Sequence, residues 1–292
     1  DAEVAYLSRG FTWEASYNLV AEEKGDSVDI VGWVTMNNQS GMLFNDAKIK
    51  LMAGDVHRVE ENVPIPFTAA AKGRAMMAMA ADAVVTEKSF DEFHLYTLGN
   101  PVTLRDKETK QVEFVRATGV KAERIYVYEG SGYSRRGSSA AGKVQVFREF
   151  KNAEANKLGL ALPKGKLRFY SQDDDRQLEF VGENQIDHTP KNEVIRVFTG
   201  NSFDLVGQRR LVSQTENNSE HVATQTIEVK VRNRKKEPAE IRVVEHATRG
   251  GNWTLTAQSQ PHEKKDATTF EFRAPLQPDE EKTVTYTIRY TW

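Results

Sequence analysis

Residues 226–233 read Thr-Ile-Glu-Val-Lys-Val-Arg-Asn, and the rest of the chain repeats the pattern that this stretch sets. Ile227, Val229 and Val231 alternate with polar and charged residues. Alternation with a period of two predicts a β-strand that buries one face and exposes the other. Asn233 stands two residues after Val231, so it falls on the same predicted buried face, and a polar turn follows it.

The same pattern occurs twice earlier in the chain. One alternating stretch leads to Asn38 and another leads to Asn152, and each is followed by a turn or loop. A polar or proline-marked turn also precedes a later strand three times, before Val112, before Val194 and before the final stretch 283–292. The strand that ends at an asparagine and the turn that precedes a later strand each occur three times. This recurrence predicts three related β-sandwich units.

The predicted fold class is therefore all-β. We expect tandem antiparallel β-sandwich (Ig-like) units, with one long Ala/Met-rich loop or short helix. The expected units are residues 1–118 with a long insert at 62–90, residues 119–202, and a C-terminal Ig-like β-sandwich at residues 203–292. The pattern leaves open whether these units make two domains or three.

Composition excludes several classes of protein. The 292 residues include 40 Lys and Arg against 42 Asp and Glu, so the formal net charge of −2 gives no general attraction to nucleic acid. The chain has no cysteine, which removes disulfides, thiolate zinc sites and thiol catalysis. No run approaches about 18 apolar residues, so we predict no transmembrane segment.

No catalytic or cofactor motif stands out. The six histidines do not form a His-Glu-x-x-His motif or another close ligand pair. Asp173–Asp175 is the best metal candidate, but its position between two strands favours a turn. We therefore expect a protein that is not an enzyme and needs no cofactor and no metal. An enzyme is the least favoured hypothesis, and it would require a pocket with converging carboxylates or histidines.

Two features could make contacts. Within the insert at 62–90, Ala69–Ala83 is built largely from Ala, Met, Gly and Lys, and it predicts either a mobile loop or helix, or an adaptable surface for a protein partner or a second copy. The residues of that surface would be Met76, Met77 and Met79. The tryptophans could instead form a sugar-stacking platform, although tryptophan in a small sandwich is more often core: Trp13, Trp33, Trp253 and Trp292.

Several short motifs also carry a resemblance. Tyr6–Tyr17 resembles the opening motif of a bacterial domain family of unknown function, related to the C-terminal domain of mucoidy-inhibitor-A-like proteins. Further short motifs along the chain resemble motifs of that family in the same order: Asn37–Gly41, Leu51–Gly54, His94–Leu98, Thr109–Val112, Leu162–Gly165, Phe180–Asn184, His188–Pro190, Trp253 and Tyr286–Trp292. The resemblance covers essentially the whole chain.

This resemblance implies a setting but no chemistry. It implies a bacterial cell envelope (periplasm or outer surface) or a secreted location, and it supplies no catalytic residues. Members usually carry a further N-terminal region and a secretion signal, so we expect a fragment or a processed form. The expected function is that of a non-enzymatic exported β-sandwich protein acting by protein–protein contact or assembly. The alternative is a cell-surface glycan-binding module.

Overall fold

The computed structural model describes residues 2–22, 25–54, 79–80, 85–90, 93–130, 139–173, 175–249 and 251–292. Nearly all regular structure in these ranges is β-strand, and their only helical segment is the short 3₁₀ turn Glu154–Asn156. The all-β prediction is confirmed. The described part of the chain holds no helix that is long and apolar enough to cross a lipid bilayer.

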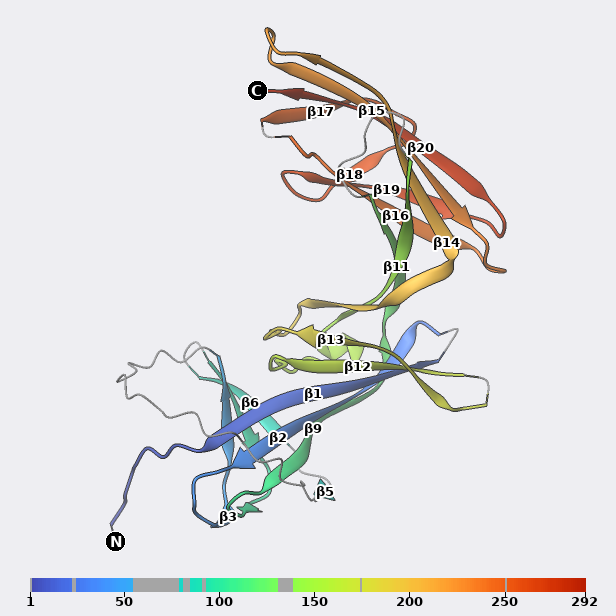
Figure 1. Ribbon diagram of the computed structural model, residues 1–292. Coiled ribbons are helices and arrows are strands. Elements are labelled where there is room, and N and C mark those ends of the chain that lie inside the picture. The colour runs from blue at the N-terminus through green and yellow to red at the C-terminus, as the bar shows by residue number, and fades with distance from the viewer. Residues whose placement is uncertain are drawn as a thin grey trace. The chain divides into compact units, whose positions relative to one another are not determined.

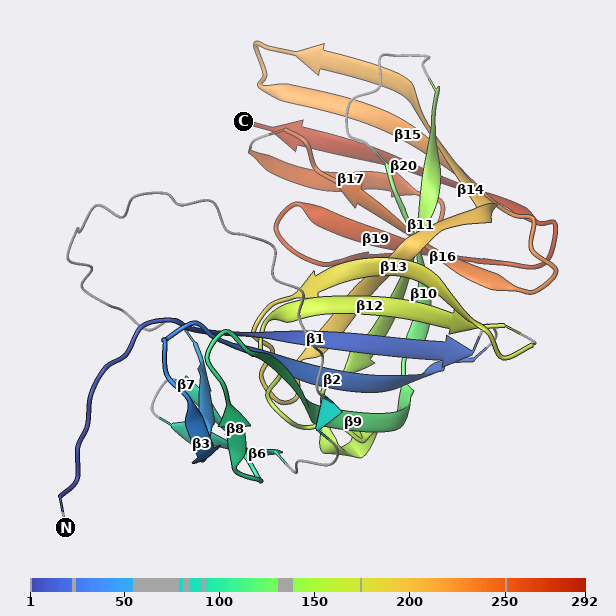
Figure 2. The same cartoon turned by 60° about the horizontal axis from the view of Figure 1, so that its bottom comes forward.

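The chain divides into two compact units. Unit 1 contains residues 1–122 and 150–195, and unit 2 contains residues 123–149 and 196–292. The main sheet of unit 1 has the strand order β13 (Leu178–Ile186), β12 (Gly165–Gln172), β1 (Phe11–Glu22), β2 (Ser27–Asn38), β9 (Thr109–Lys121) and β5 (Met79–Ala80). The first five strands lie side by side in Figure 2. Strand β1 pairs antiparallel with β2 and parallel with β12.

Two smaller sheets complete unit 1. One pairs β3 (Phe44–Ala47) with β8 (Val102–Leu104), and the other has the order β4 (Lys50–Ala53), β7 (Phe93–Leu98) and β6 (Val85–Phe90). The core follows the alternation along β1, because Tyr17 and Leu19 are buried whereas Glu14 is exposed. The Tyr17 and Phe114 rings meet edge to face, with centroids 5.7 Å apart.

Unit 2 is built on a nine-stranded sheet (Figure 1). Its strand order is β17 (Asn252–Gln258), β20 (Glu281–Thr291), β15 (Val222–Asn233), β14 (Val194–Asn217), β11 (Ser139–Lys151), β10 (Glu123–Glu129), β16 (Ala239–His246), β19 (Thr269–Leu276) and β18 (His262–Lys264). The pair β10–β16 is parallel, whereas six pairs of the same sheet are antiparallel: β10–β11, β14–β15, β15–β20, β16–β19, β17–β20 and β18–β19. The stretch that leads to Asn233 is therefore strand β15, as its alternation predicts.

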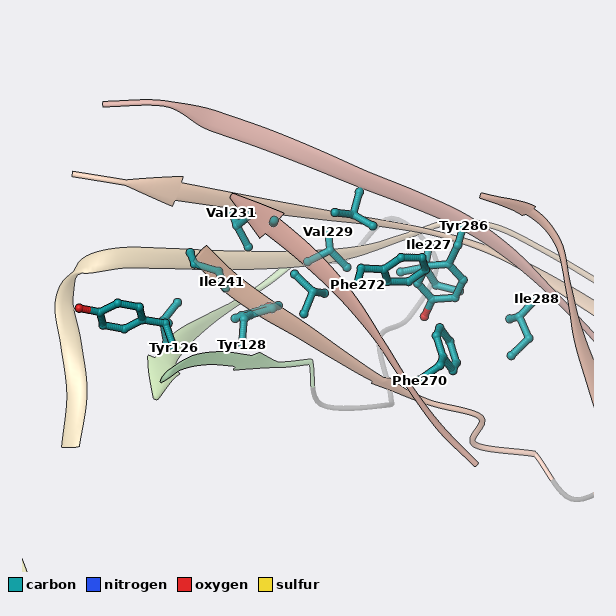
Figure 3. Close-up of a cluster of buried hydrophobic side chains, with 14 of the residues drawn as sticks. Tyr126, Tyr128, Ile227, Val229, Val231, Ile241, Phe270, Phe272, Tyr286 and Ile288 are labelled. Carbon is teal, nitrogen blue, oxygen red and sulfur yellow. The ribbon is translucent and has the colours of Figure 1, made fainter. Parts of the chain in front are cut away.

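The nine-stranded sheet folds over so that its two halves share one core (Figure 3). Tyr286 on β20 meets Phe270 and Phe272 on β19, with ring centroids 5.3 and 5.6 Å apart. Strands β20 and β19 are distant in the sheet order, so these contacts close a two-layered sandwich. Ile227 and Val229 of β15 are completely buried in the same core.

The three asparagines that mark the repeated pattern occupy equivalent corners. Asn38, Asn152 and Asn233 are completely buried, and the Nδ2 of each donates to three backbone carbonyls. The backbone N–H of each asparagine also donates to the backbone carbonyl of a glutamate that stands just before a later strand. These glutamates are Glu108 for Asn38, Glu193 for Asn152 and Glu280 for Asn233. A residue with positive φ precedes each of these glutamates: Lys107, Asn192 and Asp279. The recurrence in the sequence is thus one hydrogen-bonded corner used three times.

The grouping of strands differs from three consecutive units. The middle corner, at Asn152, lies in unit 1, whereas most of its flanking strands β11 and β14 belongs to unit 2. The Asn152 corner and the strands that flank it are therefore divided between the two compact units. The insert at 62–90 also differs in part, because β6 and the two-residue β5 fall inside the stretch expected to be a loop or helix. The rest of that insert lies outside the described residues.

Candidate functional site

An exposed apolar patch lies on β13, the terminal strand of the six-stranded sheet. Leu178, Phe180 and Val181 are 53%, 57% and 41% exposed. The ring of Tyr170, on the neighbouring strand, meets that of Phe180 edge to face at 5.8 Å. We call Leu178, Phe180 and Val181 the β13 patch. Large apolar side chains grouped on one exposed strand are typical of interaction surfaces.

A β-bulge shapes this patch. Tyr170 pairs with Phe180 and Phe169 pairs with Gly182, so Val181 has no partner residue on β12. A bulge bends the strand and interrupts the row of backbone donors and acceptors along the free edge. The bulge therefore leaves no long, regular backbone edge beside the three apolar side chains.

Opposite charges flank the patch. Arg176 precedes it in a turn, and Glu183 follows it on β13. The carboxylate of Glu183 lies 3.1 Å from Lys166 Nζ and 3.4 Å from Arg168 Nε. The hydrogen bond from Lys166 lowers the pKa of Glu183, and the charges of both cations act in the same direction. Glu183 therefore keeps its negative charge near neutral pH.

A polar cleft lies in the same unit. Its volume is about 1030 Å³, and its walls come from β1, β2, β4, β9, β12, β13 and the residues that flank β12. Trp13, Glu14 and Ser16 line it from β1, and Lys164 and His188 line it beside the start of β12. The backbone N–H of Lys164 donates to Nδ1 of His188 at 3.2 Å, which fixes His188 in the tautomer with Nδ1 unprotonated.

A buried polar cluster sits inside unit 2. Arg209 Nε donates to both carboxylate oxygens of Glu245, at 3.1 and 2.9 Å. The Tyr286 hydroxyl donates to Glu245 Oε2 at 2.5 Å. All three side chains are almost completely buried. Burial raises the pKa of Glu245, and the Arg209 guanidinium opposes that rise. Burial also raises the pKa of Tyr286 well above its usual value.

This cluster is best explained as structural. Its members come from β14, β16 and β20, which lie in different parts of the sheet, and the core surrounds them. Buried ion pairs with satisfied hydrogen bonds specify how elements pack. Sequence patterning missed the cluster, although a signal was present. Arg209 and Glu245 occupy core-phase positions between apolar neighbours two residues away, such as Leu211 and Val243.

The methionines predicted as a contact surface are only partly placed. Met76 and Met77 lie outside the described residues. Met79 belongs to β5, whose backbone pairs with that of Gln111 on β9. The structure therefore does not test the predicted methionine surface, and the β13 patch is an exposed surface that the sequence reasoning did not select.

The tryptophans are spread over separate places. Trp13 lines the cleft and Trp33 lies on β2, both partly buried. Trp253 packs against the core of unit 2, where its Nε1 donates to the carbonyl of Ala267 at 2.8 Å. Trp292 is exposed, with the Arg249 guanidinium 5.8 Å from its ring centroid. Trp13 and Trp33 thus belong to unit 1 and Trp253 and Trp292 to unit 2, and none of the four side chains is completely buried.

The predicted turn at the acidic run is present. Asp173 Oδ1 accepts hydrogen bonds from the backbone N–H groups of Asp175 and Gln177, at 3.2 and 3.1 Å. Within the described ranges, no group of three or more His, Asp or Glu side chains could hold a metal ion. Local hydrogen bonding in a turn thus accounts for the carboxylate of Asp173.

These features define an all-β protein of mainly antiparallel sheets. The family comparison agrees with this class. Residues 2–292 match the family model described as a domain of unknown function, DUF4139, and the chain belongs to that family. No curated protein and no solved structure gives a significant match.

Proposed function

We propose that this protein is not an enzyme and acts by protein–protein contact, assembling with a second copy of itself through the β13 patch. The observation that carries the proposal is the patch itself, three large apolar side chains about half exposed on the last strand of a sheet. Burying such side chains in a contact is worth roughly 1.5–3 kcal/mol each at full burial, which gives association a driving force.

The order of residues along β13 allows a second copy as the partner. When β13 faces an antiparallel copy of itself, Arg176 of each chain can lie opposite Glu183 of the other. In that register Leu178 lies opposite Val181 and Phe180 lies opposite Glu179, so the two ends of the patch match each other across the contact. Such self-complementarity is what a two-fold symmetric interface requires, and two-fold dimers are the commonest soluble assemblies.

Sedimentation velocity over a range of protein concentrations tests this contact. We expect the wild-type chain to shift from monomer to dimer as concentration rises, and Phe180→Ser to shift the midpoint to at least about tenfold higher concentration. Phe203→Ser is the matched control, because Phe203 is 96% exposed on a different strand. A wild-type chain that stays monomeric throughout contradicts the proposal.

A charge substitution tests the proposed register separately. Arg176→Glu places two carboxylates opposite each other in the antiparallel contact, so we expect weaker association at low salt and partial recovery at high salt. Arg210→Glu on β14 serves as the control for a change of the same charge elsewhere. Equal effects of the two substitutions would exclude the Arg176–Glu183 pairing.

We further propose that the protein is exported to the bacterial cell envelope or secreted, and that it is related to the C-terminal domain of mucoidy-inhibitor-A-like proteins. The sequence motifs that match across the chain support this proposal. Fractionation of cells from the native source, followed by immunoblotting, tests it. Recovery of the protein only from the cytoplasm would rule it out.

One specific observation supports the alternative function, glycan binding. Trp13 lines a polar cleft, and an aromatic ring beside hydrogen-bonding groups is the arrangement that this alternative needs.

A further inference from the structure

We propose that the cleft at the start of β12 binds a neutral saccharide. This site is separate in chemistry from the self-contact of the β13 patch and goes beyond it. The cleft has a volume of about 1030 Å³, at the upper end of the usual range for ligand sites, so it has room for more than one sugar ring.

Strand register brings the polar groups of the cleft into rows. Gln111 pairs with Thr35, and Thr35 pairs with Glu14, so an amide, a hydroxyl and a carboxylate follow one another across β9, β2 and β1. Ser16 pairs with Lys166, and Lys166 pairs with Gln185, which makes a second row across β1, β12 and β13. Directly opposite side chains in such pairs start about 4.5–5.5 Å apart. The rows therefore present closely spaced donors and acceptors.

Most of these groups are available to a ligand. Six of the lining side chains have no hydrogen-bond or ion-pair partner in the part of the chain that the structure describes: Glu14, Ser16, Thr35, Gln111, Lys164 and Gln185. Hydroxyls and side-chain amides can both donate and accept hydrogen bonds. Sugar hydroxyls also do both, so one row can bind several of them.

The ionised side chains of the cleft leave few cations for an anionic ligand. Lys166 and Arg168 both pair with Glu183, whose single negative charge offsets one of their two positive charges. Glu14 is negative and Lys164 is positive, so the wall carries a net charge of +1, and Lys164 is its only cation without a carboxylate partner among the described residues. A site for phosphate or a polyanion would present an excess of unpaired cations. The balance in this cleft instead fits a ligand whose polar groups are hydroxyls.

Trp13 supplies an aromatic surface for the same ligand. Because side chains alternate along a strand, Trp13 leaves β1 on the opposite face from Glu14 and Ser16. All three line the cleft, so it bends around the first residues of the strand. The C–H groups of one sugar ring can pack on the indole while other rings of the same oligosaccharide reach the polar rows. This combination of one aromatic ring with several amides and hydroxyls distinguishes a saccharide from an apolar ligand.

Isothermal titration calorimetry of the full chain tests the site with two probes, the neutral hexasaccharides of glucose and of N-acetylglucosamine. We expect at least one probe to bind. We expect Trp13→Ala and the double variant Thr35→Val/Gln111→Ala each to weaken binding by about tenfold or more. Thr254→Val, an exposed threonine of β17, should bind as the wild type does. Thermal unfolding checks that each variant is folded.

Three results would overturn the inference. The first is that neither hexasaccharide binds at millimolar concentration. The second is that binding survives unchanged in the folded double variant. The third is that an anionic hexasaccharide of uronic acid binds more tightly than both neutral probes, because two of the three cations in the wall already pair with Glu183. The Phe180→Ser variant, which tests the self-contact, should bind the probe normally, so the two proposals can fail independently.

Discussion

The side-chain amide of Asn233 donates to the backbone carbonyl of Gln277 at 3.2 Å, although 44 residues separate them in the sequence. The same Nδ2 also donates to the carbonyls of Glu237 and Leu276, at 2.8 and 3.4 Å. One buried side chain thus joins the end of β15 to the approach of β20. Asn38 and Asn152 make the corresponding joints in unit 1.

Substitution at Asn233 should destabilise unit 2 strongly. Asn233→Ala leaves buried carbonyls without donors, at a cost of about 1–3 kcal/mol for each group that water cannot reach. Asn233→Asp should cost more, because a carboxylate oxygen replaces the amide that faces three carbonyls. Urea unfolding followed by circular dichroism measures both changes. Asn218→Ala, at an exposed turn, should alter the free energy of unfolding by less than about 0.5 kcal/mol.

Breaking the buried pair between Arg209 and Glu245 should also be costly. Arg209→Met leaves the Glu245 carboxylate buried without its cation, and removing one partner of a buried pair typically costs about 3–5 kcal/mol. The double variant Arg209→Met/Glu245→Leu removes both charges and should recover much of that loss. Urea unfolding of the two single variants and the double variant gives the coupling energy. Additive effects would show that the two residues do not stabilise the fold as a pair.

Tyr128 gives a prediction for alkaline pH. Burial raises the pKa of Tyr128 to about 12, and the nearby negative charge of Glu245 adds to that rise. A raised pKa means that the folded state keeps the phenol neutral when the unfolded state has begun to ionise near pH 10. The stabilisation from Tyr128 is therefore complete below about pH 10 and is lost as pH rises towards about 12.

Tyr128→Phe should flatten the loss of stability over that same pH range. Urea unfolding at closely spaced alkaline pH values measures the difference between variant and wild type. Tyr6→Phe, in an exposed position, is the control. An identical pH dependence for Tyr128→Phe and the wild-type chain would show that ionisation of Tyr128 does not contribute to the loss of stability at alkaline pH.

Gly207 should not tolerate a side chain. A Cβ added there would lie 2.0 Å from Cδ2 of the Tyr128 ring, so Gly207→Ala forces buried residues apart. We expect a loss of about 1–3 kcal/mol in the free energy of unfolding. At Gly25 the nearest atom would be 3.5 Å from the added Cβ, so Gly25→Ala should be tolerated. A lower thermal midpoint for Gly207→Ala alone is the expected result.

Alternation in the sequence was sufficient to predict the fold class. The residues that alternate around Ile227 and Val229 form β15, and the recurring asparagines form equivalent corners. It could not predict how strands group, because pairings such as β1 with β12 and β10 with β16 join distant segments in parallel. A period of two says which face of a strand is buried, but it does not identify the neighbouring strand.

The surfaces were harder to predict for a related reason. Leu178 and Phe180 alternate like core residues, but Phe180 pairs with Tyr170, on the face of the sheet opposite the buried Phe169. The cleft depends on register, since Gln111, Thr35 and Glu14 become neighbours through strand pairing. The methionines were selected on composition alone, and Met76 and Met77 lie outside the described residues. The exposure of a side chain and its neighbours on adjacent strands depend on the tertiary structure, so the local sequence pattern does not predict them.

Site-directed cross-linking tests the self-contact of β13 most directly. The chain has no cysteine, so Leu178→Cys and Val181→Cys each introduce a unique thiol. In the antiparallel register, a mixture of the two variants should form disulfide-linked dimers faster than either variant alone. The pair Phe203→Cys and Val212→Cys, exposed on β14, is the control. Equal cross-linking rates for the β13 mixture and the β14 control would contradict the proposed assembly.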